Sequence, residues 1–190
     1  MPLFSFRRLE IDPLPVSMSG VKLGERLLQI GVDDAVLAGQ LAAKTGLSGT
    51  AAHVVTDDAA ANKVRVGAKK AGVLSEVHVA LLDRLPFEDA SFDLVVIHSA
   101  SGQLAAATAE ERLAGLRECL RVLRPGGRLF AIEPGTPAGL TSMLRSAPAA
   151  QVGFDAAGGA TAALERAGFS PVRQLADREG LKFTEGLRSN

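Results

Sequence analysis

Short apolar runs without polar interruptions recur along the 190-residue chain, and they constrain its fold more than any other feature. Runs of this kind are typical of strands buried on both faces, as in a parallel sheet. Segments with helical periodicity lie between them, over 34–46, 59–72 and 109–127. The alternation predicts a doubly wound α/β sheet with right-handed crossovers. The expected strands are RLLQI (26–30), AHVVT (52–56), VHVALL (77–82), FDLVVI (92–97) and RLFAI (128–132).

The C-terminal part departs from this alternation. Residues 158–169 have a helical pattern, and two strand-like segments follow on either side of Gly180. They predict an antiparallel hairpin at the edge of the sheet. The first twenty residues and the Ala/Pro/Gly-rich stretch 134–160 are the least regular, and either could cover a site. We therefore expect an N-terminal extension over 1–20, irregular or forming part of a lid, and an α/β domain over 21–190.

Charge and composition narrow the choice of partner and compartment. The 21 basic and 21 acidic residues give zero net charge, which argues against nucleic acid or a membrane as a partner, although a local patch stays possible. The absence of Trp and Tyr disfavours a surface for base stacking. No apolar run approaches a membrane span or a signal peptide, and the single Cys119 cannot form an internal disulfide. We expect a cytoplasmic protein.

Three segments resemble class I S-adenosylmethionine-dependent methyltransferases, in particular the small-molecule, type 11-like branch that includes quinone-biosynthesis enzymes. They are LPFEDASFDLVV (85–96), VLRPGGRLFAIEP (122–134) and LERAGFSPVR (164–173). Their order and spacing fit the family from about residue 24 to residue 187. The resemblance implies a single-domain, Rossmann-like sheet of seven strands that ends in an antiparallel strand, and S-adenosylmethionine as cofactor.

The resemblance places the family's glycine-rich cofactor loop directly after the first strand, where it is degenerate. Gln29 occupies the family's acidic position and Gly31 the first glycine, whereas Asp33 and Ala35 replace the second and third. The Asp33 carboxylate could obstruct the cofactor's own carboxylate, or it could pair with the ammonium or sulfonium group. Together with Asp34 it could equally well cap the helix that begins near Ala35.

Carboxylates follow the next two strands. Asp57 matches the family residue that accepts hydrogen bonds from both ribose hydroxyls, and Asp58 lies one position further on. Asp83 matches the acid near the adenine amino group, and we assign its neighbour Arg84 to the same cofactor site. Aspartates at strand ends are also common as turn or helix-cap residues, which is the structural alternative for each of them.

Catalysis, if present, requires mainly that donor and acceptor are held in line. An oxygen or nitrogen acceptor would also need a base, and His98 at the end of the fourth strand is the candidate; its alternative role is to form hydrogen bonds in the core. The aspartates after the first two strands could hold Mg²⁺ only if adjacent side chains converged. We expect no metal.

Two hypotheses of function result. The first is methyl transfer from S-adenosylmethionine to an unidentified small-molecule acceptor, favoured by Asp57 and Asp83. The second is a catalytically inactive methyltransferase-like protein for binding or assembly, with weak or no cofactor affinity, favoured by the altered loop. A homodimer is one option for its assembly. An NAD-binding Rossmann protein is less favoured, because the loop lacks G-x-G-x-x-G.

Overall fold

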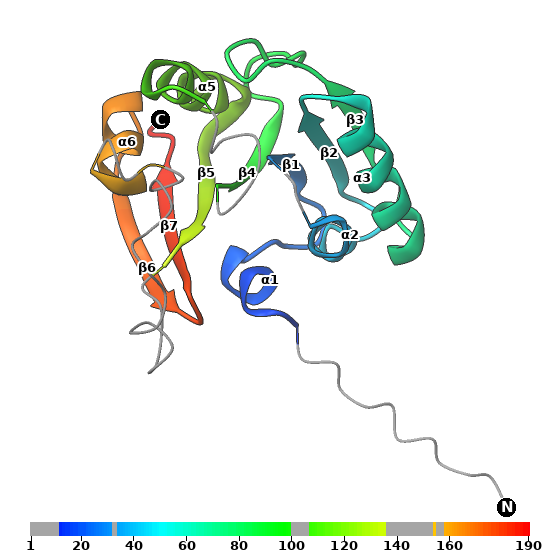
Figure 1. Cartoon of the computed structure of the whole chain (residues 1–190). Coiled ribbons are helices and arrows are strands. Elements are labelled where there is room, and N and C mark those ends of the chain that lie inside the picture. Colours follow the sequence, from blue (N-terminus) through cyan, green and yellow to red (C-terminus); the bar gives the residue numbers. More distant parts are fainter. Residues whose placement is uncertain (1–11, 32–33, 100–106, 136–153, 155–157) are drawn as a thin grey trace, which may run out of the picture.

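One mixed sheet runs through the computed structural model, with helices against both of its faces (Figure 1). The structure describes residues 12–31, 34–99, 107–135, 154 and 158–190. The strands are β1 (Arg26–Ile30), β2 (Thr50–Val55), β3 (Glu76–Val79), β4 (Phe92–His98), β5 (Leu123–Pro134), β6 (Val172–Arg178) and β7 (Leu181–Leu187). The helices are α1 (Leu14–Ser19), α2 (Ala35–Lys44), α3 (Asp58–Ala71), α5 (Ala109–Val122) and α6 (Gly159–Ala167).

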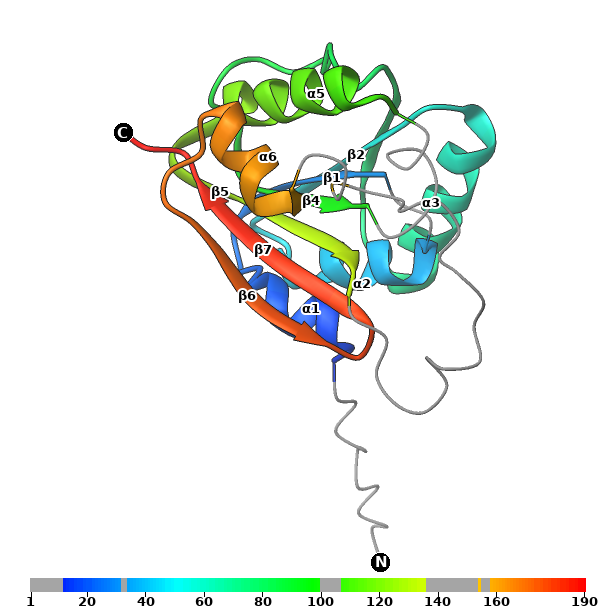
Figure 2. The ribbon, with the colours of Figure 1, turned by 60° about the vertical axis from the view of Figure 1, so that its left-hand side comes forward.

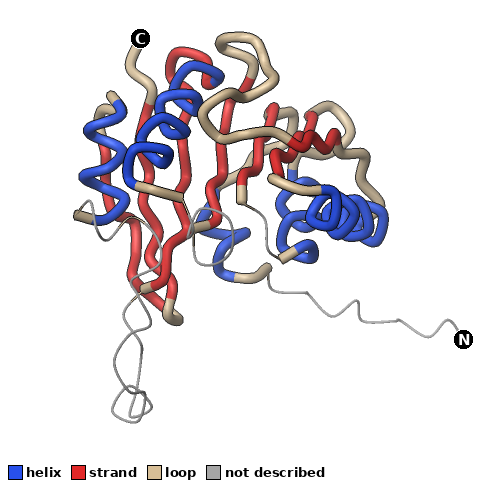
Figure 3. Tube along the Cα trace, turned by 45° about the horizontal axis from the view of Figure 1, so that its top comes forward, coloured by secondary structure: helices blue, strands red, loops and turns tan. Residues whose placement is uncertain are grey.

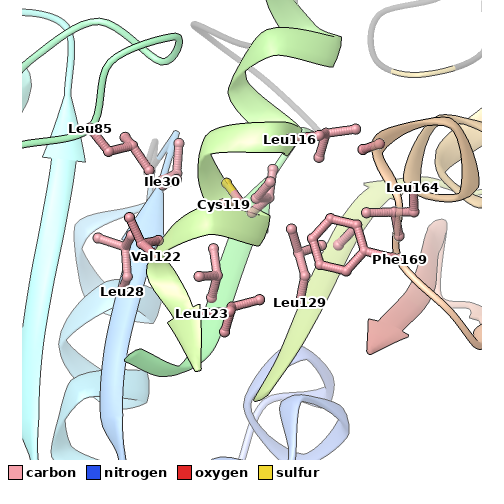
Figure 4. Close-up of a cluster of buried hydrophobic side chains, with 14 of the residues drawn as sticks. Leu28, Ile30, Leu85, Leu116, Cys119, Val122, Leu123, Leu129, Leu164 and Phe169 are labelled. Carbon is pink, nitrogen blue, oxygen red and sulfur yellow. The ribbon is translucent and has the colours of Figure 1, made fainter. Parts of the chain in front are cut away.

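The strands lie in the order β3-β2-β1-β4-β5-β7-β6, and the first five of these are parallel (Figure 3). Helices α1, α2 and α3 pack on one face of the sheet, where Leu27, Leu94 and Phe130 are fully buried. Helices α5 and α6 pack on the other face around Leu28, Leu116 and neighbouring residues (Figure 4). The expected three-layer α/β architecture is confirmed.

The C-terminal hairpin is also confirmed, and its place in the sheet is specific. β6 and β7 are joined through Glu179 and Gly180, whose φ values of 56° and 74° suit a tight two-residue turn. β7 lies between β5 and β6 and is antiparallel to both (Figure 2). The seventh strand is therefore an inner strand, and β6 forms the edge.

Two sequence expectations need correction. The segment 77–82 was expected to be a strand buried on both faces, but β3 ends at Val79 and is half-exposed, and Leu81 is 70% exposed. The reason is that β3 is an edge strand, with a neighbour on one side only. The helical segment 109–127 was expected to precede a strand over 128–132, whereas α5 ends at Val122 and β5 already begins at Leu123, meeting β4 through a register shift.

The N-terminal residues that are described belong to the packed structure. Within the expected extension 1–20, α1 buries Val16 against the sheet, and the backbone carbonyl of Gly20 accepts a hydrogen bond from Arg128 at 2.7 Å. The division at residue 20 stays a prediction. Most of the irregular stretch 134–160 lies outside the described residues. Within the described ranges, no helix combines the length and apolarity needed to cross a membrane.

Candidate functional site

The topology of the sheet points to the carboxyl ends of β1 and β4. After β1 the chain continues to β2 and β3 on one side, and it then returns to β4 on the other side. At such a switch point the crossovers diverge and leave a crevice, where ligands of open α/β sheets bind. Ile30 and Ile97 are the last paired residues of β1 and β4. Gly31 and His98 follow them in register at this edge.

Gly31 turns the chain at the end of β1. It is buried and has φ 72°, a left-handed conformation that glycine adopts without strain. Because it has no Cβ, a ligand can approach its backbone closely. This geometry fits the first glycine of a cofactor loop. Asp33, two residues further on, lies outside the described residues.

Asp34 ends the same loop and caps α2. Its Oδ1 accepts hydrogen bonds from the backbone N–H groups of Val36 at 2.8 Å and Leu37 at 3.1 Å. The capping role considered for this residue is confirmed. Two amides at the amino end of α2 are thus already engaged by a carboxylate, so a ligand's carboxylate gains little from them. The charge of Asp34 itself would attract an ammonium group.

Asp57 occupies the matching position after β2, and it caps α3. Its Oδ1 accepts a hydrogen bond from the Ala60 N–H at 2.8 Å, and Oδ2 accepts one from the Thr56 hydroxyl at 3.4 Å. The residue is exposed, and a carboxylate offers more acceptor positions than these two bonds use. Capping and ribose binding are therefore compatible. Asp58 is exposed in the first turn of α3.

Asp83 and Arg84 lie in the loop between β3 and β4, and both are exposed. Beside this loop, a cavity of about 10 Å³ is lined by Ile30, Leu82, Ile97 and Arg112, together with side chains from α5. A space of this size holds about one water molecule. An adenine ring could enter only if Leu82 or Arg112 moved.

Gln29 lies beneath α2 and is fully buried. Its amide nitrogen donates a hydrogen bond to the carbonyl of Ala38 at 2.9 Å, which ties β1 to α2. Its Oε1 is buried and accepts no hydrogen bond within the described part of the chain. The contact seen for Gln29 is therefore a structural one, and its assignment to the cofactor site stays a prediction.

Two histidines lie near Gln29 on the same face of the sheet. His53 pairs with Gln29 across β1 and β2 and is fully buried, and His98 ends β4 almost completely buried. Burial, and to a lesser extent the charge of His98, lowers the pKa of His53 to about 4. The sequence pattern assigned no role to His53. Its register opposite Gln29 became evident only with the strand pairing.

A buried carboxylate on the other face of the sheet was missed from the sequence. Glu133 near the end of β5 is 2% exposed, and its Oε1 accepts a hydrogen bond from the Ala160 N–H at 3.1 Å, at the start of α6. The Lys182 ammonium lies 3.4 Å from Oε2. The sequence feature that could have identified Glu133 is a glutamate within an apolar strand, in FAIEP (130–134). In the ranges described, no three His, Cys, Asp or Glu side chains gather as a metal site.

Comparison with known proteins decides the family. A family described as a methyltransferase domain, of type 11, matches residues 28–131, which is more than half of the chain. The chain belongs to this methyltransferase family. The match covers β1 to β5 and therefore includes the switch point, Gly31, Asp57 and His98.

Curated relatives match the chain at modest identity. The chain is 34% identical over 128 residues to the ubiquinone/menaquinone biosynthesis C-methyltransferase UbiE of Vibrio vulnificus, with 64% of this chain and 46% of that protein aligned. It is 35% identical over 132 residues to the demethylmenaquinone methyltransferase of Beutenbergia cavernae, with 70% and 48% aligned. The chain thus spans about half the length of these relatives.

Solved structures agree on the fold. A SAM-dependent methyltransferase from Aquifex aeolicus superposes with a TM-score of 0.70 at 18% identity, over 91% of this chain and 87% of that one. One from Methanosarcina mazei gives 0.66 at 19% identity, over 94% and 99%. Membership of the methyltransferase family supports S-adenosylmethionine as the cofactor, as the sequence led us to expect.

Proposed function

We propose that this protein transfers a methyl group from S-adenosylmethionine to a small-molecule acceptor at the carboxyl ends of β1 and β4. The observation that carries the proposal is the pairing of two features at one edge of a methyltransferase sheet. Gly31 presents backbone without a side chain, and Asp57 presents an exposed carboxylate at the end of the neighbouring strand. A carboxylate suits a ribose diol because it accepts both hydrogen bonds.

The residues at this edge fit the nucleoside half of the cofactor. Asp57 would accept from the ribose, with Asp58 next to it, and Asp83 with Arg84 would lie toward the adenine. At the other end, the Asp34 carboxylate favours the ammonium group of the methionine part. Because Asp34 already accepts hydrogen bonds from the Val36 and Leu37 amides, which a ligand's carboxylate would otherwise use, we expect weak binding, with a Kd of tens of micromolar or about −6 kcal/mol.

When bound, S-adenosylmethionine supplies an activated methyl carbon on its sulfonium sulfur. The chain contributes position and proton transfer. His98 directly follows Ile97, the β4 residue that pairs with Ile30, so its backbone lies at the same sheet edge as the Gly31 turn that would hold the donor. We assign it the role of taking the proton that the acceptor atom loses, whether that atom is oxygen, nitrogen or carbon. The first acceptors to test are of the demethylmenaquinone class, after which the Beutenbergia relative is named.

Calorimetry with S-adenosylmethionine and S-adenosylhomocysteine tests the cofactor site. Asp57→Asn should weaken binding at least tenfold, because asparagine keeps the α3 cap but loses the charged double acceptor. Glu165→Gln removes an exposed carboxylate from α6, outside the proposed site, and serves as the matched control. Asp57→Ala also removes the cap, so it should lower the melting temperature as well. Failure of the wild-type protein to bind either nucleoside would refute the proposed activity.

A second candidate function is a methyltransferase-like binding or assembly protein without catalysis. The small size of the cavity beside Ile30 and the occupation of the α2 amides by Asp34 both favour it. The same titration separates the two candidates. An absence of heat with both nucleosides, in a protein that melts cooperatively, would support assembly. Binding that depends on Asp57, together with methyl transfer to an acceptor, would exclude it.

A further inference from the structure

The outer face of α3 concentrates positive charge in a chain whose net charge is zero. Residues 59–75 contain four basic residues and no acidic one: Lys63, Arg65, Lys69 and Lys70. All four are exposed. Arg65 donates a hydrogen bond to the side chain of Asn62 at 3.2 Å, and among the described residues none of the four forms an ion pair. Their charge is therefore not neutralised locally.

A groove accompanies these charges at the C-terminal end of α3. It has a volume of about 400 Å³ and is lined by Arg65 and Lys69 together with the apolar Ala68, Val73 and Leu74. Arg65 and Lys69 are four residues apart, so they lie on the same side of the helix. The Ser75 hydroxyl at this groove is buried and has no hydrogen-bond partner in the described part of the chain. The groove thus combines cations, an apolar wall and an unused hydroxyl.

Large aliphatic side chains project beside the charges. Leu74 is 98% exposed just after α3, and Val66 is 54% exposed on the helix itself. Leu47 is fully exposed in the loop before β2, and this loop lies at the same edge of the sheet as Leu74, because β2 and β3 are adjacent and parallel. Basic residues interleaved with exposed aliphatic ones are typical of surfaces that bind at the membrane interface.

We propose that this surface, defined by Lys63, Arg65, Val66, Lys69, Lys70 and Leu74 and called the α3 face, docks reversibly on bilayers that contain anionic lipids. The charges attract the headgroups, and Leu74 with Val66 enters the interface. Nucleic acid is the less suitable anion, because the chain has no Trp or Tyr on which bases could stack. Zero net charge led us to expect no membrane contact, but the uneven distribution of charge supports a local one.

A purely structural role accounts for only part of the α3 face. Lys69 and Lys70 lie in the last turn of α3, where cations complement the helix dipole. Lys63 and Arg65 lie in the middle of the helix, where the dipole gives no such benefit, and Leu74 lies beyond it. With α3 along the bilayer, over a length of about 21 Å, Asp57 at its amino end would stay beside the membrane surface.

Sedimentation of the full chain with lipid vesicles tests the proposal. The experiment contains no cofactor, so its outcome is independent of the proposed methyl transfer. We expect binding to phosphatidylcholine vesicles with about 30% phosphatidylserine, little binding to pure phosphatidylcholine, and loss of binding at high salt. Arg65→Gln with Lys69→Gln should weaken binding about 25-fold, at about fivefold for each charge. Leu74→Ser should weaken it without changing the salt dependence.

The matched control is Arg117→Gln with Arg166→Gln, which removes two exposed charges from α5 and α6, on the opposite side of the molecule (Figure 1). It should bind vesicles like the wild type. The proposal would be overturned if the protein bound neutral vesicles as well as anionic ones, or if the control variant lost as much vesicle binding as the α3 variant. Tighter binding to single-stranded RNA than to anionic vesicles would also overturn it. Thermal melting of each variant checks that it is folded.

Discussion

Replacing Gly67 with alanine should disturb both the stability and the candidate site, because α2 and α3 meet there without room for a side chain. A Cβ at Gly67 would lie 2.0 Å from the carbonyl oxygen of Ala35, and one at Gly39 would lie 2.7 Å from the Gly67 carbonyl oxygen. Real contacts of this kind begin near 3.0 Å, so the first turn of α2 must retreat by about 1 Å. That turn carries Asp34 and follows the Gly31 loop.

The expected loss of stability follows from two opposing contributions. Overpacking against rigid backbone costs about 3 kcal/mol, the upper part of the usual range. Alanine is favoured over glycine inside a helix by about 1 kcal/mol. The net loss is therefore about 2 kcal/mol, which lowers the melting temperature of a domain of this size by roughly 4–8 °C. A displacement of about 1 Å near a reactive site can reduce turnover by up to about 100-fold.

Thermal melting and nucleoside calorimetry of Gly67→Ala check both effects. Gly115→Ala in α5 is the control, since its Cβ would lie 3.1 Å from the Leu82 Cβ and 3.4 Å from the Leu82 carbonyl oxygen, so Leu82 has to give by only a few tenths of an ångström. We expect the control to change stability by less than about 1 kcal/mol. A Gly67→Ala protein as stable as the wild type, with unchanged nucleoside affinity, would show that α2 and α3 are not in the close contact described.

Three further predictions concern single side chains. The free energy of unfolding should depend on pH through His53. Its pKa of about 4 in the folded protein lies below the value of 6.5 for an unfolded histidine. Its contribution is therefore fully present above pH 6.5 and is lost as the pH falls toward 4. At pH 5 the loss is about 2 kcal/mol, which urea unfolding can measure, and His53→Gln should abolish this pH dependence. The prediction is contradicted if the unfolding free energy of the variant falls as steeply with pH as that of the wild type. Arg188→Ala should lower the melting temperature by several degrees, about 2 kcal/mol, because its guanidinium donates hydrogen bonds to the carbonyls of Leu120, Arg121 and Leu123 at the end of α5; unchanged melting would be inconsistent with these bonds. Burial raises the pKa of the Cys119 thiol well above its usual range, so a thiol reagent should label it only at the rate of unfolding, and fast labelling in native buffer would show otherwise.

The sheet was predictable from the sequence because its parallel strands must be apolar on both faces. The run 26–30 was located residue for residue, and α2, α3, α5 and α6 were located to within about five residues, whereas α1 lies in a segment for which no helix was predicted. β3 was overextended because Leu81 and Leu82 continue the apolar run, although an edge strand needs less cover and ends earlier. The length of an apolar run therefore predicts how many of its residues are buried only for a strand that has neighbouring strands on both sides.

The site was less predictable, because side-chain partners depend on strand register. The capping role of Asp34 could be expected from its place before a helix, and it is confirmed. The bond from Gln29 to Ala38 and the burial of His53 beside it could not, since neither leaves a pattern in the sequence. Glu133 was visible as a charged residue inside an apolar strand, but only the fold shows that it meets Lys182 and α6.

The inner position of β7 has a consequence for synthesis on the ribosome. The outer edge of β5 is complete once Pro134 has left the exit tunnel, yet the strand that pairs with it starts at Leu181, about 47 residues later. At about 5–20 residues per second, that edge waits for roughly 2–9 seconds with unpaired backbone groups. During this interval the exposed edge of β5 could pair with another chain, and binding of a chaperone would be most useful for preventing aggregation.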